Sequence, residues 1–454
     1  MKNLGWIGIA RLGLIQASLG AVVVMATGTL NRVMVVEIGL PALIPGILVA
    51  WHYLIQIVRP RLGHGSDQGG RRTPWIIAGI AMLGLGAVGA AVATSMMASQ
   101  PTLGILFAWI DYSLIGIGGG CAGTSLLVLL AQRTAPERRP AAATLVWIMM
   151  IAGFVITAGL AGRVIDPYSP ERLIAVVTTV AAIALIISTL AVWGMEGKDS
   201  IESLPSQSKT ENSNSHQTDF MTAVREVWSE PQARLFAGFV FIAMLAYSAQ
   251  ELLLDPFAGK VYGYSPGEST QLNGIQHGGA LVGMVLVALL GTLRKGKDLG
   301  SPRFCTQFGC ISSAFMLIII ASSAAGHLGW PLKEMVFALG VANGLFAVSA
   351  IAAMMQMVGQ GTQQREGVRM GIWGAAQAVA FAMGGLVGTG LSDLARALLE
   401  DAGLAYALVF CIQALFFITA AYLAKNLFSL ASSSSSRRSI TQKQEDLVSL
   451  AQEA

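Results

Sequence analysis

The chain has 454 residues, of which 54% are hydrophobic and only 12% are charged. Soluble domains carry about 25% charged residues, so this composition excludes an ordinary soluble protein and predicts a polytopic membrane protein. The net charge of +4 does not indicate nucleic-acid binding, because the basic residues lie between apolar segments.

Twelve apolar segments have the length of membrane-spanning helices, which need about 20 residues each. The expected spans lie near residues 10–30, 41–60, 74–97, 104–131, 141–163, 172–194, 233–254, 268–293, 303–326, 331–357, 368–393 and 403–427. We therefore predict an all-α membrane protein with the spans grouped in two six-helix halves.

A polar segment separates the two groups of spans. We expect an N-terminal half over 1–196, a cytoplasmic linker over 197–231 and a C-terminal half over 232–428. The linker begins with a stretch rich in Ser, Asn, Gln and charge, a composition typical of flexible segments. The tail over 429–454 contains five consecutive serines, and we expect it to be disordered in the cytoplasm.

A weak internal repeat supports two related halves. Ala161–Asp166 at the end of the fifth span resembles Thr389–Asp393 at the end of the eleventh, and Arg138 and Arg365 precede the same two spans. Such repeats are common in transporters, so the two halves are predicted to be pseudo-symmetric.

The distribution of basic residues predicts the orientation of the chain. With the N-terminus in the cytoplasm, most of the 29 lysines and arginines fall in cytoplasmic segments. Positive residues favour the inside of the membrane. Both termini are therefore predicted to be cytoplasmic.

The seventh span carries an unusual set of polar residues. Gln250 and Glu251 lie at a depth where an unpaired polar group costs several kcal/mol, and Asp255-Pro256 follows. Proline lacks an N–H and crowds the preceding turn, so we expect the helix to break there. A site that handles a ligand would explain these residues. A helix end whose carboxylates cap the backbone or pair with Lys260 would also explain them.

Several other patterns are interpreted as structural. A literal GxGxxG over 116–123 lies inside a span with no preceding strand, so close helix packing explains it better than nucleotide binding. The cysteines contain no CxxC pair, and neither a metal site nor a disulfide is expected. Asp111 in the fourth span either pairs across the bundle or lies near the outer mouth.

The loop after the second span resembles the signature loop of the major facilitator superfamily, Gly-x-x-x-Asp-x-x-Gly-Arg-Arg. The matching residues are Gly63, Asp67, Gly70, Arg71 and Arg72. The resemblance implies the twelve-helix fold of that superfamily and a conformational role for the loop, and it says nothing about a substrate.

Two further stretches resemble the PucC/LhaA group, the bacteriochlorophyll-delivery branch of the superfamily. They are Gly28–Pro41, with Asn31-Arg32 and Glu37, and Ala246–Gly259, with Gln250-Glu251 and Asp255-Pro256. The resemblance implies an assembly factor for light-harvesting complexes in the bacterial intracytoplasmic photosynthetic membrane. Its expected cargo is (bacterio)chlorophyll, and its expected partners are antenna polypeptides and pigment-synthesis enzymes.

A chlorophyll cargo would need an axial ligand for its magnesium, which prefers oxygen or imidazole donors. The candidates at membrane depth are His52, His277, Gln276, Gln250, Glu251 and Gln16, with His52 and His277 favoured. A buried histidine that only packs and hydrogen bonds is the competing interpretation for both histidines.

A second predicted cluster lies toward the outer side. Pseudo-symmetry is expected to bring Asn31 and Arg32, at the end of the first span, near Asp255 and Lys260. We predict that this outer polar cluster closes the central cavity.

The residues offer no support for an enzyme, since no nucleophile triad, metal-ligand cluster or phosphate loop is present in the sequence. The leading prediction is pigment delivery during antenna assembly. A sugar or cation symporter of the same superfamily, or a scaffold without cargo, are the alternatives.

Overall fold

A computed structural model describes residues 4–56, 71–135, 138–196, 225, 228–293, 301–326, 329–358 and 366–453. Within these ranges all regular secondary structure is helical. Eleven helices are long and apolar enough to cross a membrane, and α3 is a shorter apolar helix. The predicted all-helical architecture is confirmed.

The N-terminal half begins with an irregular helix that runs from Trp6 to Glu37. Its α-helical parts are separated by two π-helical segments, η1 and η2. The elements of this half are α1 (Trp6–Val24), η1 (Met25–Thr29), α2 (Leu30–Arg32), η2 (Val33–Glu37), α3 (Leu43–Ile55), α5 (Thr73–Met97), α6 (Pro101–Arg133), α7 (Arg139–Val164) and α8 (Pro170–Val192).

The C-terminal half consists of six long helices. They are α10 (Pro231–Tyr262), α11 (Pro266–Leu293), α12 (Pro302–Ala324), α13 (Leu332–Val358), α14 (Glu366–Leu398) and α15 (Ala402–Glu453). Most of the predicted linker lies outside the described residues.

Local sequence explains where several helices start. Proline occupies one of the first two positions of α6, α8, α10 and α12, where its missing N–H has no intrahelical acceptor to lose. Ser169 and Ser301 precede α8 and α12, and each side chain accepts a hydrogen bond from a first-turn amide, that of Arg172 or Phe304. These caps satisfy donors that the helix itself cannot pair.

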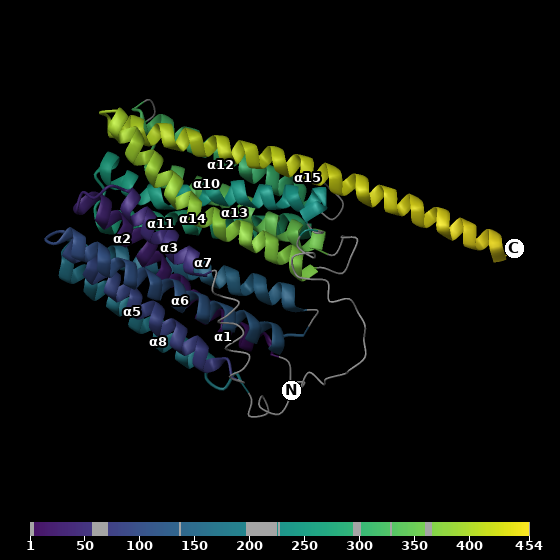
Figure 1. Ribbon diagram of the computed structural model, residues 1–454, viewed down its shortest axis with the longest axis horizontal. Helices are drawn as coiled ribbons and strands as arrows, with labels where there is room; N and C mark the ends of the chain where they lie inside the picture. Colours follow the sequence, from purple (N-terminus) through teal and green to yellow (C-terminus); the bar gives the residue numbers. More distant parts are fainter. Residues whose placement is uncertain are drawn as a thin grey trace.

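Each half has its own hydrophobic core. One core gathers buried residues from Ile9 to Met195, and the other gathers residues from Phe236 to Leu427. Figure 1 shows the N-terminal half in purple and blue on one side of the bundle and the C-terminal half in green and yellow on the other. Leu252 of α10 belongs to the N-terminal core, so the seventh span reaches across the boundary between the halves.

Several contacts join the halves. α7 packs against α11, α3 packs against α14, α10 packs against η1, α2 and η2, and α11 also packs against η1. We define the outer end of the bundle as the side at which α7, α10 and α14 terminate. The helices α3, α11 and α15 begin at the same side. The outer end lies opposite the end that carries the two chain termini (Figure 1).

Two expectations about helix ends are wrong. The predicted break at Asp255-Pro256 does not occur, because α10 continues through Pro256 to Tyr262. The first span does not end near residue 30 but stays helical to Glu37, so Asn31 and Arg32 lie inside it and are buried. The irregularity that we expected in the seventh helix is found in the first.

The tail also differs from the expectation of disorder. α15 continues to Glu453 as one helix that extends beyond the bundle (Figure 1). A helix can continue past the packed core where its sequence contains few residues that oppose it, and no glycine or proline occurs after Gly403.

Candidate functional site

The buried polar side chains of α10 and α11 meet close to the first helix. Gln250 and Asp255 on α10 are 0% and 1% exposed, and Asn273 and His277 on α11 are each 2% exposed. Asp255 follows Glu251 by one helical turn, and His277 follows Asn273 by one turn. Residues four apart share a helix face, so two acids on α10 are set against an amide and an imidazole on α11.

The outer part of this site is the pair Asp255 and Asn273. The Asn273 Nδ2 donates to the Asp255 Oδ2 at 3.2 Å. Gly28 of η1 lies directly against the pair, since a Cβ added there would be 2.8 Å from the Asp255 Oδ2. The other carboxylate oxygen, Oδ1, has no hydrogen-bond partner among the described residues. A π-helical segment thus faces a buried and incompletely bonded carboxylate, and such segments often occur at functional sites.

The inner part of the site is the pair Glu251 and His277. The Nδ1 of His277 lies 3.0 Å from the backbone oxygen of Asn273. A carbonyl oxygen can only accept, so Nδ1 carries a proton, and in the neutral imidazole Nε2 presents its lone pair. Nε2 is 3.9 Å from the Glu251 carboxylate and has no hydrogen-bond partner in the described part of the chain. The Phe154 ring of α7 covers the imidazole edge-on at 4.7 Å between centroids.

Gln250 points into the C-terminal half. Its Oε1 accepts from the Asn343 Nδ2 at 3.3 Å, and the Asn343 Oδ1 accepts from the Ser313 hydroxyl at 2.9 Å. This chain joins α10, α13 and α12, and all three residues are buried. Gln250 therefore takes part in packing within one half.

Asn31 explains why α10 does not break at its proline. Pro256 has no N–H, so the Leu252 carbonyl loses the donor that an ordinary helix would supply four residues later. The Asn31 Nδ2 donates to this carbonyl at 2.7 Å. A side chain of the first helix thus satisfies the group that the proline leaves free, which is how membrane helices tolerate proline.

Arg32 is bonded elsewhere than expected. Its guanidinium donates to the Glu37 carboxylate at 2.5 Å, to the Tyr264 carbonyl at 2.5 Å and to the Ser269 hydroxyl at 3.3 Å. No hydrogen bond or ion pair between Arg32 and Asp255 is found among the residues described. Lys260 is half-buried and likewise forms no ion pair within the described ranges. Closure of a cavity by this cluster stays a prediction.

The remaining pigment-ligand candidates lie in the N-terminal half. His52 of α3 is 2% exposed, its Nδ1 lies 2.6 Å from the Val49 carbonyl, and its ring is 4.0 Å from that of Tyr53. Gln16 of α1 donates to the Met150 sulfur of α7 at 3.2 Å. The structure thus brings Glu251 and His277 together, whereas His52 and Gln16 lie on other helices, α3 and α1.

The signature loop is only partly described. Gly63, Asp67 and Gly70 lie outside the described residues, and Arg71 is exposed. The backbone amides of Arg72 and Thr73 both donate to the Glu196 carboxylate, the second at 3.0 Å. An acid that follows α8 therefore caps the start of α5, where a negative charge is favourable.

Asp111 lies on α6 against Gly89 of α5, in its own half. The neighbours Asn273 and Asn343 were not among the sequence candidates. The spacing of four residues between Asn273 and His277 is the signal that could have identified Asn273. Asn343 has no comparable signal, because it comes from a distant apolar span.

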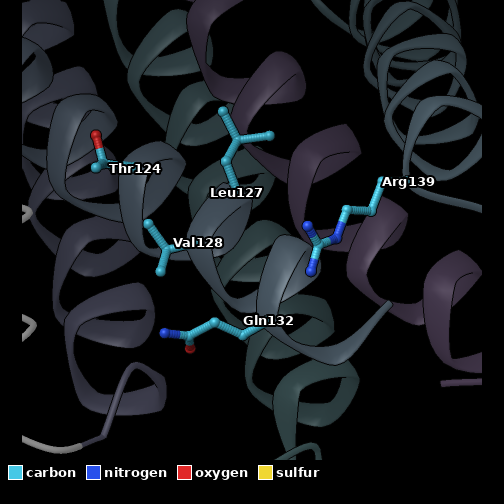
Figure 2. Close-up of a pocket in the computed structure, with 5 residues that line it drawn as sticks. All are labelled: Thr124, Leu127, Val128, Gln132 and Arg139. Carbon is cyan, nitrogen blue, oxygen red and sulfur yellow. The ribbon is translucent and has the colours of Figure 1, made fainter. Parts of the chain in front are cut away.

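A pocket of about 420 Å³ lies at the inner end of the N-terminal half. Figure 2 shows its lining, which comes from the last turns of α6 and the first residue of α7. Leu127 and Val128 form the apolar wall, and Gln132 and Arg139 are the polar groups at the end of α6. The pocket is not formed by the polar residues of α10 and α11.

Comparison with solved structures shows the fold. The chain superposes on a bacterial homologue of the human drug peptide transporters PepT1 and PepT2 with a TM-score of 0.65 and 14% sequence identity, over 94% of this chain and 98% of that one. The predicted fold of the major facilitator superfamily is therefore confirmed, and the chain is an integral membrane protein.

Comparison with curated proteins shows the family. The chain is 49% identical over 423 residues to the "Bacteriochlorophyll synthase 44.5 kDa chain" of Rhodobacter capsulatus, covering 93% of this chain and 95% of the relative. It is 27% identical over 435 residues to "Protein PucC" of the same organism, covering 91% and 90%. The family profile described as "PUCC protein" matches residues 29–431. The chain is thus a member of the PUCC protein family.

Proposed function

We propose that this protein is an assembly factor for photosynthetic light-harvesting complexes and that it holds (bacterio)chlorophyll for delivery to antenna polypeptides. It binds and passes on its cargo without a catalytic step. The observation that carries the proposal is the imidazole of His277, whose Nε2 lone pair has no hydrogen-bond partner among the described residues.

The chemistry of His277 suits the magnesium of a chlorophyll. Magnesium accepts imidazole and oxygen ligands, and a ligating histidine usually donates its other N–H to a carbonyl, as Nδ1 does here to Asn273. His52 makes the same kind of Nδ1 contact to a carbonyl of its own helix. Of the two histidines, however, only His277 has a buried ring nitrogen without a hydrogen-bond partner among the described residues. Gln250 is hydrogen bonded through its Oε1 to Asn343 within its own half.

The family supports the same cargo. The name of one relative, "Bacteriochlorophyll synthase 44.5 kDa chain", supports a cargo of this class. The proposed setting is the intracytoplasmic photosynthetic membrane, with both termini in the cytoplasm because the positive residues gather there. Pigment-synthesis enzymes and antenna polypeptides are the proposed partners.

The burial of His277 bears on how a cargo would reach it. His277 is 2% exposed and is covered by Phe154 of α7. We expect a macrocycle to reach the imidazole when α7 moves away from α11. The proposal therefore includes an exchange between a closed and an open arrangement of the two halves.

Pigment analysis of the purified protein tests this function. The protein is isolated in mild detergent from a photosynthetic host, and its absorption spectrum is recorded. Wild type is expected to carry (bacterio)chlorophyll, and His277→Leu is expected to lose most of it. His52→Leu is the matched control and is expected to keep it. A colourless wild-type protein, or His277→Leu with unchanged pigment, would contradict the proposal.

A secondary transporter is the second candidate, and one observation favours it. Glu251 and Asp255 are acids one turn apart within the bundle, and buried intramembrane acids often mark ion or substrate pathways. This alternative would be supported if the protein in proteoliposomes took up a labelled sugar and Glu251→Gln lowered the rate of that uptake.

A further inference from the structure

Two carboxylates at the outer end occupy equivalent places in the two halves. Asp166 follows the end of α7, the fifth helix of the first half, and Asp393 lies near the end of α14, the fifth helix of the second half. These are the aspartates that end the two matching segments of the sequence repeat. Each one reaches across the boundary between the halves.

Asp166 binds the start of α11. The Gly267 amide donates to its Oδ1 at 3.1 Å, and the Ser265 hydroxyl donates to its Oδ2. Gly267 directly follows Pro266, the first residue of α11. Amides in a first helical turn have no partner within the helix, so Asp166 supplies an acceptor from the other half.

Asp393 binds the start of α3 in the same way. The amides of Ala42 and Leu43 donate to Oδ1 and Oδ2 at 3.0 and 2.8 Å. Ala42 directly follows Pro41. In both halves, therefore, a proline precedes an amide at the start of the second helix, and the aspartate of the opposite fifth helix accepts from that amide.

Small residues bring the same helix pairs into close contact. A Cβ on Gly162 of α7 would lie 2.6 Å from the Gly267 carbonyl, and a Cβ on Gly46 of α3 would lie 3.0 Å from the Thr389 Cβ of α14. Each carboxylate thus acts where two helices of different halves already touch. Separation of the outer ends must break the bonds of both aspartates.

We propose that Asp166 and Asp393 form a paired latch that holds the outer end closed. Each carboxylate accepts two hydrogen bonds, and its negative charge faces the positive end of a helix. Asp166 lies at the outer end of the α7–α11 contact, and Asp393 lies at the outer end of the α3–α14 contact. His277 and Phe154 belong to α11 and α7. The latch itself involves no cargo, so it can be tested without pigment.

A reporter cysteine measures opening of the latch. Ser269 on α11 is 0% exposed, and Ser269→Cys introduces a thiol of similar size. The exposed Cys411 is replaced by serine, and labelling by a maleimide is followed in mild detergent. Asp166→Ala, Asp393→Ala and the double variant are compared with this parent.

The control variant is Asp401→Ala. The Asp401 carboxylate accepts from the Leu404 amide at 2.9 Å at the start of α15, so it caps a helix at the same end of the bundle but within one half. Removing it tests whether the loss of any helix cap exposes the reporter.

Each single Ala variant is expected to label roughly tenfold faster than the parent, and the double variant roughly a hundredfold faster. Asp401→Ala should match the parent. Labelling of both single variants within about twofold of the parent, or an equal rise in Asp401→Ala, would overturn the latch.

Asp166→Asn and Asp393→Asn cover the case in which the Ala variants do not fold, as judged by size-exclusion chromatography. They keep the side-chain volume and one acceptor oxygen, and they lose the charge. Intermediate labelling is expected, and labelling equal to the parent would overturn the latch.

Discussion

Replacing Asn31 by leucine tests how the first helix supports the proline in α10. The Asn31 side chain donates at 2.7 Å to the Leu252 carbonyl. Pro256, four residues later in α10, has no N–H to donate to that carbonyl. Both Asn31 and Leu252 are buried, at 0% and 3% exposure, so no water replaces the lost donor. We expect Asn31→Leu to destabilise the folded protein.

The expected magnitude follows from the group that is left without a partner. A buried carbonyl that loses its hydrogen bond costs about 1–3 kcal/mol. Pro256→Ala restores an N–H that can donate to Leu252 along the helix, and it makes the Asn31 bond redundant. In the Pro256→Ala background, Asn31→Leu should therefore cost less than about 0.5 kcal/mol. The coupling free energy between the two positions is expected to be about 1–2 kcal/mol.

The four proteins of this cycle are compared in one detergent by an unfolding titration with tryptophan fluorescence. Thr27→Val is the matched control, because it removes a side-chain hydrogen bond to a carbonyl of its own helix, that of Val23 at 3.1 Å, with no proline in the following turn. It should change the free energy of unfolding by much less than Asn31→Leu. Equal costs of Asn31→Leu in both backgrounds would refute the link between Asn31 and Pro256.

Three further changes test other parts of the site. Gly28→Ala should destabilise the protein by about 1–3 kcal/mol in the same titration, since its Cβ would meet Asp255, whereas Gly278→Ala on α11 has open space and should be neutral or slightly stabilising. Asn343→Leu should cost about 1–3 kcal/mol, because it strands the Gln250 carbonyl oxygen; a cost below that of Gly278→Ala would contradict this. Glu196→Gln should lower the midpoint of thermal unfolding, through a loss of about 0.5–2 kcal/mol at the start of α5, and an unchanged midpoint would contradict the cap.

The sequence predicts the parts of the fold that depend on composition. Apolar length identifies the helices, and the matching segments that end in Asp166 and Asp393 identify related positions in the two halves. The structure then gives those aspartates reciprocal partners, Gly267 and Ala42. A repeat in sequence cannot name such partners, because they lie in the opposite half.

The wrong expectations share a physical cause. The break at Pro256 was inferred from local backbone chemistry alone, and the side chain that removes the cost of the proline, Asn31, lies far away in sequence. Pseudo-symmetry was expected to bring Arg32 near Asp255, and in the structure the donors of Arg32 are directed to Glu37 and to two oxygens of the α10–α11 region. Tertiary partners decided both outcomes, and one sequence without its fold does not contain them.

The buried polar groups differ in whether a given donor or acceptor atom has a partner. Asn31 and Asn343 use their donors on acceptors that would otherwise be unpaired, which is sufficient reason for their presence in a membrane interior. The Nε2 of His277 and the Oδ1 of Asp255 have no such partner among the described residues, although both side chains are at most 2% exposed. A group that is buried and unpaired carries a cost in the closed state. Under the proposed function, that cost would be offset if the open state offered these atoms a ligand. Other buried atoms without a partner among the described residues, such as both amide atoms of Gln276, carry the same kind of cost.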